Sequence, residues 1–153
     1  MFRLNRLTDY AVVVLSQMAH RPDETWTATR IAGETGVPLP TVAKLLNALV
    51  HGGLISSHRG ASGGYTLNRP AEAVTVAEII QALEGPIALT ACVDGQTGGC
   101  DVESLCPMRG NWDRVNRAIR RALSEVTLAD MAVGFFFPAP AGQSTEPVAT
   151  AVD

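Results

Sequence analysis

Three cysteines are the residues of this 153-residue chain whose spacing most clearly suggests chemistry. Cys92, Cys100 and Cys106 lie within fifteen residues, in a segment that also holds several glycines. An odd number of cysteines does not indicate a disulfide framework, and their clustering argues against three incidental thiols. Structural zinc commonly uses a Cys-x2-Cys pair, and the sequence has none. The wider spacing favours an iron–sulfur cluster, whose irons bind thiolates farther apart.

Three thiolates leave one ligand of such a cluster to be found elsewhere. The histidines, His20, His51 and His58, are all distant in sequence, while the acidic residues beside the cysteines are generic candidates. A weakly held fourth ligand would make a cluster labile. Lability suits a sensor and does not suit an electron carrier.

The elements before the cysteines predict a winged helix. Apolar residues at helical spacing between 7 and 19 predict a first helix capped by Thr8 or Asp9. A short helix ending at Gly36 and a third helix opened by Pro40 then form a helix-turn-helix. Residues 54–67 have β-prone ends around a glycine-rich tip, as in a two-stranded hairpin. The predicted fold class is therefore mainly α with a small β-hairpin wing.

A long helix is predicted after the cysteines. Thr75 caps a fourth helix, and Pro107 opens the long one, whose apolar positions step by three and four. This spacing favours a homodimerisation helix, with a helix packed in its own core as the alternative. The other face of the helix holds four arginines. The apolar positions are Trp112, Val115, Ile119, Ala122 and Val126, and the arginines are Arg114, Arg117, Arg120 and Arg121.

Four segments follow from these elements. Residues 1–86 form a winged helix-turn-helix domain and residues 87–106 a cysteine-rich cluster-binding loop. Residues 107–132 form the dimerisation helix and its end, and residues 133–153, rich in Pro, Ala and Thr, a disordered tail.

The charge distribution allows the N-terminal segment to bind nucleic acid. The formal net charge is −3, which taken alone argues against nucleic acid. Residues 1–70, however, carry seven Lys and Arg against four Asp and Glu, a balance of +3, whereas residues 71–153 carry five against eleven, a balance of −6. The N-terminal segment is therefore mildly basic.

Side chains that could contact DNA lie on the third helix and in the hairpin. If the apolar stripe of the third helix faces the core, Thr41 and Lys44 point away from it, in the turns that enter a major groove. An ordinary solvated face is the alternative for this pair. Arg59 sits among glycines that allow close approach to a phosphate or a narrow minor groove.

Other classes of protein are disfavoured. No apolar run is long enough to cross a bilayer, and the faintly signal-like N-terminus lacks a cleavage site, so we expect a mature, cytoplasmic protein without a membrane partner. There is no Ser/His/Asp arrangement and no phosphate loop, so we expect neither an enzyme nor a small-molecule substrate.

The sequence resembles the IscR/NsrR-type winged-helix iron–sulfur regulators over about residues 1–132. The motifs that carry the resemblance are residues 4–11, residues 37–42, the Arg-Gly-x-x-Gly-Gly-Tyr wing at 59–65 and the three-cysteine loop. Residues 76–87 and 109–112 look most like the branch that regulates SUF-system iron–sulfur assembly.

The resemblance implies a homodimer that binds a pseudo-palindromic operator in double-stranded DNA and carries an iron–sulfur cluster, 2Fe-2S in preference to 4Fe-4S. It places three residues of the third helix in the major groove and Arg59 in the minor groove, with four further wing residues in contact with DNA. The predicted DNA-binding set is Pro40, Thr41, Lys44, Ser57, Arg59, Gly60, Gly63 and Tyr65.

The resemblance also implies the cluster ligands Cys92, Cys100 and Cys106. The IscR branch has a histidine three residues after its third cysteine, where this chain has Arg109, which cannot ligate, and the first cysteine gap is longer than usual. Asp9 falls where the NsrR branch uses an aspartate of the partner subunit, so it completes the predicted ligand set. An N-capping role is the alternative for Asp9.

The implied function is a cluster-sensing repressor of iron–sulfur assembly genes. A nitric-oxide- or redox-sensing regulator of stress genes is the alternative within the same class. A structural-zinc DNA-binding protein and a small electron carrier are the alternatives from other classes.

Overall fold

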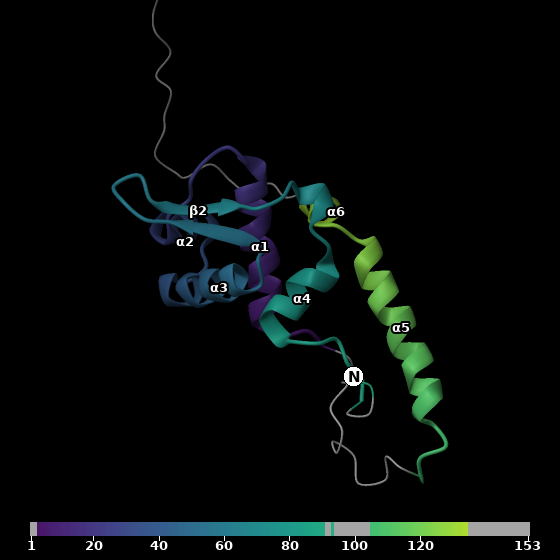
Figure 1. The fold of residues 1–153 in the computed structure, drawn as a ribbon. Coiled ribbons are helices and arrows are strands. Elements are labelled where there is room, and N and C mark those ends of the chain that lie inside the picture. The colour runs from purple at the N-terminus through teal and green to yellow at the C-terminus, as the bar shows by residue number, and fades with distance from the viewer. Residues whose placement is uncertain (1–2, 91–92, 94–104, 135–153) are drawn as a thin grey trace, which may run out of the picture.

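The computed structural model describes residues 3–90, 93 and 105–134 (Figure 1). A two-stranded sheet and the helices of the N-terminal half form one body, and a long helix, α5, stands beside it. The predicted fold class, mainly helical with a small antiparallel hairpin, is confirmed. The elements are α1 (Arg6–His20), α2 (Ala28–Thr35), α3 (Leu39–His51), β1 (Ile55–His58), β2 (Gly64–Leu67), the 3-10 turn η1 (Ala71–Ala73), α4 (Val76–Glu84), α5 (Arg109–Glu125) and α6 (Leu128–Ala132).

Helix α1 begins earlier than the sequence pattern predicts. Its N-cap is Asn5, whose side-chain oxygen accepts a hydrogen bond from the backbone N–H of Leu7. Thr8 is only 1% exposed and uses its hydroxyl in a contact with Glu84, so it is not free to cap. The predicted caps, Thr8 and Asp9, are therefore wrong, and Asp9 lies inside the first turn.

The helix-turn-helix follows the predicted boundaries. Thr27 caps α2 by accepting the N–H of Arg30 at 3.2 Å, and Gly36 ends it with φ of 75°, a conformation that favours glycine. Pro40 lies in the first turn of α3, where its missing N–H costs nothing. This helix ends at Gly52, and Gly53 has φ of 72°.

The wing has a second backbone pairing that the sequence did not reveal. Strands β1 and β2 pair antiparallel, with Ile55 opposite Leu67 and His58 opposite Gly64. On the other side of β2, Trp26 and Tyr65 exchange two backbone hydrogen bonds, of 2.9 and 2.7 Å. The Trp26 side chain is 1% exposed, so it joins the wing to the core.

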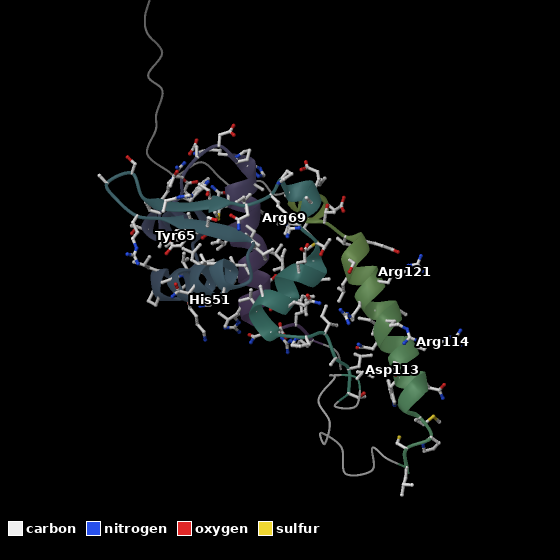
Figure 2. All side chains as sticks on the ribbon, viewed as in Figure 1. His51, Tyr65, Arg69, Asp113, Arg114 and Arg121 are labelled. Atoms are coloured by element: carbon white, nitrogen blue, oxygen red, sulfur yellow. The ribbon has the colours of Figure 1, made fainter. Side chains whose placement is uncertain are left out.

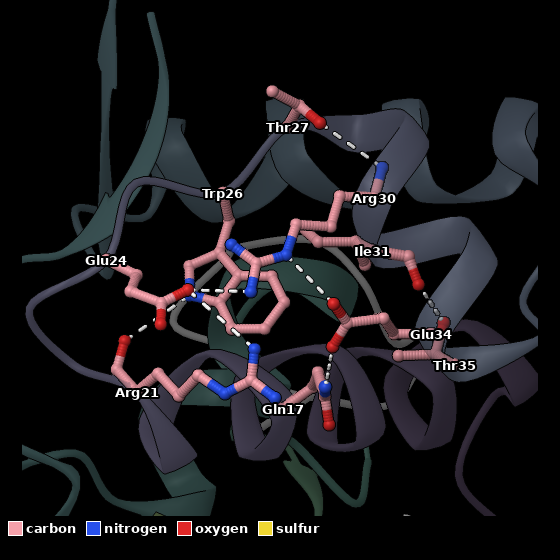
Figure 3. Close-up of polar contacts among 9 residues, drawn as sticks. All are labelled: Gln17, Arg21, Glu24, Trp26, Thr27, Arg30, Ile31, Glu34 and Thr35. Atoms are coloured by element: carbon pink, nitrogen blue, oxygen red, sulfur yellow. Dashed lines mark hydrogen bonds and ion pairs between the residues drawn. The ribbon is translucent and has the colours of Figure 1, made fainter. Parts of the chain in front are cut away.

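Polar contacts around Trp26 fix α2 against α1 (Figure 3). The Arg30 guanidinium lies 4.0 Å from the centre of the Trp26 ring and pairs with Glu24 at 2.6 Å and Glu34 at 2.8 Å. Gln17 of α1 donates a hydrogen bond to Glu34. Partial burial alone would raise the pKa of Glu34, but the hydrogen bonds from Arg30 and Gln17 outweigh it and lower that pKa.

The chain returns to the N-terminal body after α5. Val126 is extended, and its carbonyl accepts the N–H of Val76 at 2.9 Å, so α5 ends at Glu125 and the prediction that Val126 continues its apolar stripe is wrong. Thr127 then opens α6 with a capping box. Leu128 is fully buried in the core that α1, α3 and the hairpin share.

The core of the body supplies the rigid support for the DNA-reading elements. Most of its fully buried members come from α1, α2, α3 and the turn after α3, and they pack against one another with Ile79 of α4 and Leu128 of α6. They include Ala11, Val14, Leu15, Ile31, Val42, Leu45, Leu46, Leu49 and Leu54. A second, smaller cluster holds α4 against α5, through Val76, Ala77, Ile80 and Ile87 on one side and Ile119 and Leu123 on the other.

No helix in the described part of the chain is both long enough and apolar enough to span a membrane. The predicted tail lies outside the described residues from 135 onward.

Candidate nucleic-acid interface and cysteine-loop site

Helix α3 leaves one face exposed to solvent. Because Val42, Leu45, Leu46 and Leu49 are fully buried, the N-terminal turns leave other side chains outward. Lys44 is exposed, as the periodicity predicts, Thr41 is half-buried, and Pro40 is exposed. Within the described ranges, the Lys44 ammonium has no ion pair. This cation is available to an anionic ligand.

The tip of the wing holds Arg59 in solvent. Ser57, Arg59 and Gly60 are exposed, and the turn is closed by a hydrogen bond of 2.9 Å from the Gly63 N–H to the Gly60 carbonyl. A Cβ at Gly63 would lie 2.5 Å from the His58 carbonyl oxygen, and Gly60 has φ of 114°. Both glycines are predicted DNA contacts, but the turn that carries Arg59 also requires glycine at these two positions.

Tyr65 has a structural role as well as a predicted DNA contact. Its ring is half-buried and packs on the core, while its backbone pairs with Trp26. Figure 1 shows the hairpin and α3 together on the side of the body remote from α5. The structure therefore brings the predicted DNA-contact residues of α3 and the wing to one side of the body.

Of the predicted cysteine ligands, only Cys106 lies among the described residues. Its thiol is half-buried and free, three residues before α5 begins. Cys92 and Cys100 fall outside the described ranges. Across the part that the structure describes, no three His, Cys, Asp or Glu side chains gather as a metal site.

Asp9 lies on α1, and its side chain is exposed. It lines a groove of about 410 Å³ between the start of α1 and α4, together with Arg3, Arg6 and the apolar side chains of Val12 and Ile80. Asn5 takes the N-cap position, so the N-capping alternative for Asp9 is wrong. The exposed Asp9 carboxylate at the edge of this groove can face a second molecule.

The donor set suits an iron–sulfur cluster by its chemistry. Thiolates are the usual ligands of such clusters, and the sequence supplies three of them in one short segment. An exposed carboxylate such as Asp9 is an oxygen donor for a fourth position. Cys106, a free thiol at the C-terminal end of the loop, is accessible enough to serve as a ligand.

Two polar side chains that sequence reasoning missed secure the N-terminal base of the cysteine loop. Asn116 of α5 is 6% exposed, accepts the N–H of Leu89 at 3.1 Å and donates to the Ile87 carbonyl at 3.0 Å. Glu84, the last residue of α4, accepts hydrogen bonds from the Asn5 N–H at 2.9 Å and from the Thr8 hydroxyl. For Asn116, the one available sequence signal of a buried role was the position of an asparagine next to the apolar stripe of α5. Nothing in the sequence marked Glu84.

Helix α5 buries only part of its apolar surface. Ile119 and Leu123 face α4, whereas Trp112 is 42% and Val115 43% exposed. Figure 2 shows Arg114 and Arg121 projecting away from the body. The alternative of an ordinary core helix therefore accounts for the C-terminal half of the apolar stripe of α5 and leaves the N-terminal half, with Trp112 and Val115, uncovered in the single chain.

Comparison with known proteins identifies the family. The Rrf2 family, described as iron-dependent transcriptional regulators, matches residues 4–134. The Mycobacterium tuberculosis protein Rv1287, named as an HTH-type transcriptional regulator, is 30% identical over 136 residues, which cover 86% of this chain and 82% of that protein.

Solved structures of two named regulators are among those similar to this chain. CymR (YrzC), the global cysteine regulator of B. subtilis, superposes with a TM-score of 0.66 at 26% identity, covering 89% of this chain and all of that one. IscR of T. potens superposes with a TM-score of 0.61 at 27% identity, covering 85% of each chain.

The relatives are transcriptional regulators, which agrees with the sequence-based expectation that the chain is no enzyme. With the winged helix and its exposed basic residues described above, these matches lead to one conclusion. The chain is a DNA-binding transcriptional regulator that belongs to the Rrf2 family.

Proposed function

We propose that this protein is an iron–sulfur-cluster-sensing, sequence-specific repressor of iron–sulfur assembly genes that acts in the cytoplasm as a homodimer. The observation that carries the proposal is the position of three cysteines in the sequence directly before α5, between the winged helix and a helix whose apolar stripe is only partly covered. The similarity to T. potens IscR supports it.

The DNA-reading roles follow from exposure and charge. Pro40, Thr41 and Lys44 lie at the start of α3, the part of a recognition helix that enters the major groove. Arg59 is suited to reach a phosphate or a minor groove, because it is exposed on the turn that Gly60 and Gly63 shape. Ser57 lies nearby on β1. A pseudo-palindromic operator in double-stranded DNA would match the two-fold symmetry of a dimer.

The homodimer is supported by α5. Trp112 and Val115 present large exposed apolar side chains, and burying them against a second copy would be favourable by about 25 cal/mol for each Å² removed from water. Figure 1 shows α5 on the side of the body remote from α3, so a dimer through α5 would leave both DNA-reading surfaces free. Dimerisation also doubles a basic surface that is small in one chain.

Four side chains of this chain would hold the cluster. Cys92, Cys100 and Cys106 would supply thiolates from one protomer, and Asp9 would supply a carboxylate to its partner. A bound cluster, 2Fe-2S in preference to 4Fe-4S, would supply chemistry sensitive to iron supply, oxidants and nitric oxide. A loop of one protomer joined to α1 of the other would fix the spacing of the two α3 helices, and its release would change that spacing and the affinity for DNA.

Anaerobic purification followed by visible and Mössbauer spectroscopy tests the cofactor. We expect iron and acid-labile sulfide in stoichiometric amounts, lost in Cys106→Ser, and a less stable cluster with a shifted spectrum in Asp9→Ala. One mole of zinc per chain without visible absorption would contradict the proposal and favour a structural-zinc regulator. An Asp9→Ala protein with an unchanged spectrum and stability would remove Asp9 from the ligand set.

A second candidate is a redox-sensing regulator that uses the thiols without a cluster. It is favoured by the half-buried free Cys106 and by the similarity to CymR of Staphylococcus aureus in its oxidized form, at a TM-score of 0.60 and 28% identity over 86% of this chain. Under this alternative, metal-free protein would change its DNA affinity on mild oxidation, and reduction would reverse the change.

A further inference from the structure

Two polar clamps secure the segment that leads into the cysteine loop. The first is Asn116, whose buried amide satisfies the Leu89 N–H and the Ile87 carbonyl of that segment. Leu89 precedes Cys92 by three residues. Because the amide binds one backbone donor and one backbone acceptor, it holds residues 87–89 in a defined position on α5.

The second clamp is Glu84, five residues before Leu89. Its carboxylate joins the C-terminal end of α4 to the N-terminal end of α1, through the Asn5 backbone N–H and the Thr8 hydroxyl. The Thr8 hydroxyl belongs to a residue that is 1% exposed, so losing its acceptor would leave a buried polar group unsatisfied. Asp9 is the next residue.

Helix α1 connects this end of the molecule to the DNA-reading elements. It packs on α2, α3, α4 and α6, and its Ala11, Val14 and Leu15 side chains are fully buried in the shared core. Close-packed cores transmit small displacements and do not absorb them. This core therefore connects the first turn of α1 to α3 through close packing.

From this arrangement we infer that Glu84 and Asn116 are positioning residues that transmit the state of the cysteine loop to α1. Asn116 fixes the base of the loop on α5, and Glu84 passes a displacement of residues 84–89 to the turn that carries Asp9. This inference rests on the proposed function, because it adds a route within one protomer to the link between protomers by which a change at the cysteines would alter DNA binding. Neither residue contacts the predicted DNA surface.

The test compares operator affinity with and without cluster in a set of variants. Glu84→Ala removes the acceptor, whereas Glu84→Gln keeps an oxygen that can accept both hydrogen bonds. Thr8→Val breaks the same link at its other end and leaves no unsatisfied hydroxyl, so it stays informative if Glu84→Ala folds poorly. Glu72→Ala, an exposed acidic residue on η1, controls for the loss of one negative charge.

We expect the ratio of cluster-bound to cluster-free operator affinity to fall by about fivefold in Thr8→Val, which loses one hydrogen bond, and by at least as much in Glu84→Ala, which loses two. Iron content and the affinity of the cluster-free protein should stay at wild-type values. Glu84→Gln and Glu72→Ala should keep the wild-type ratio. In Asn116→Ala, the loop thiols of cluster-free protein should react faster with an alkylating reagent, because the base of the loop is released.

Each outcome bears on the inference. If the ratio of cluster-bound to cluster-free affinity differs from 1 in the wild type and Thr8→Val keeps the wild-type ratio, the relay through Glu84 and Asn116 is wrong. The proposed function then survives. If the ratio falls but only in parallel with the melting temperature of every variant, Glu84→Gln included, the contacts are merely structural and the relay is wrong. If the wild-type ratio is 1, the proposed function and the relay fail together.

Discussion

Lys44 is the only lysine in the chain, and it stands on the exposed face of α3 without an ion pair in the described ranges. A lysine at this position gains nothing for folding and is suited to a phosphate or a base edge. We expect Lys44→Ala to weaken operator binding by roughly 1–3 kcal/mol if the contact is to a base, and to reduce the salt slope by about 1 if it is to a phosphate.

The matched control for Lys44→Ala is Arg114→Ala, which removes the same charge from the side of α5 that points away from the body. Fluorescence titration with labelled operator at several salt concentrations gives both the operator affinity and its salt slope. Wild-type affinity and slope in Lys44→Ala would remove this residue from the interface.

Glu34 makes stability depend on pH. Its pKa lies below the usual value because the hydrogen bonds from Arg30 and Gln17 outweigh the effect of burial. A lowered folded-state pKa adds stability that is complete above the unfolded pKa, about 4.5, and is lost as the pH falls through the lower folded value. We therefore expect the difference in free energy of unfolding between wild type and Glu34→Gln to be largest near pH 6 and to shrink below pH 4.5 or so.

Urea denaturation at pH 6, 5, 4 and 3 measures that difference. Asp130→Asn serves as a comparison, since the pKa of Asp130 is also lowered, by hydrogen bonds from the Thr127 backbone and side chain outside the Trp26 network. A Glu34→Gln difference that stays constant over this range would contradict the assignment.

The residues that the sequence alone predicts as site residues are those whose proposed roles follow from residue type and local spacing. The three cysteines, Arg59 among its glycines and Lys44 opposite an apolar stripe all belong to this group. Glu84, Asn116 and Trp26 escaped notice because their partners lie 79, 29 and 39 residues away. Tertiary contacts of this kind leave no periodic signal.

At the scale of elements, the wing tip depends on glycine geometry. A Cβ at Gly63 would meet the His58 carbonyl at 2.5 Å, so Gly63→Ala has to distort the turn that presents Arg59. We expect Gly63→Ala to weaken operator binding and to lower stability. Operator titration and urea denaturation measure the two effects.

Gly33→Ala is the matched control for the wing. Gly33 lies within α2, where an added Cβ meets nothing within 4 Å, so alanine should stabilise the protein by about 0.5–1 kcal/mol through helix propensity. Gly33→Ala should bind the operator as the wild type does. Wild-type operator affinity in Gly63→Ala would mean that the tip geometry does not matter for DNA binding.

Elements with strong local signals were predicted well, and elements defined by tertiary contact were not. The boundaries of α2, α3 and α4 follow from Thr27, Gly36, Pro40 and Thr75, whose capping or turn chemistry is local. Helix α6 has five residues, too few for an apolar period, and it is fixed by the pairing of Thr127 with Thr75 and by the burial of Leu128.

At the scale of the whole molecule, the charge distribution and α5 both favour a dimer. One chain carries a balance of only +3 over residues 1–70, and each protomer supplies a single DNA-reading face. Two such faces joined through α5 would provide more phosphate contacts and a steeper salt dependence. A monomer that bound the operator as tightly as a dimer would contradict this account.

Val115 is the position at which to test the dimer. Its side chain is 43% exposed on α5, so Val115→Glu should fold normally but place a charge in the proposed interface. We expect sedimentation equilibrium to show a dimer for the wild type and a monomer for Val115→Glu, with operator affinity reduced at least tenfold or so by the loss of the second half-site. Arg117→Glu, exposed on the arginine side of α5, is the control and should remain dimeric.

The central claim is that a cluster held by the cysteine loop controls the binding of DNA by the winged helix. The most direct test is to measure operator affinity and specificity for anaerobically reconstituted and cluster-free wild-type protein side by side, at the same salt concentration and oligomeric state. We expect the two forms to differ by about 5- to 150-fold, the usual range of allosteric coupling. Equal affinity and specificity in the two forms would contradict the account.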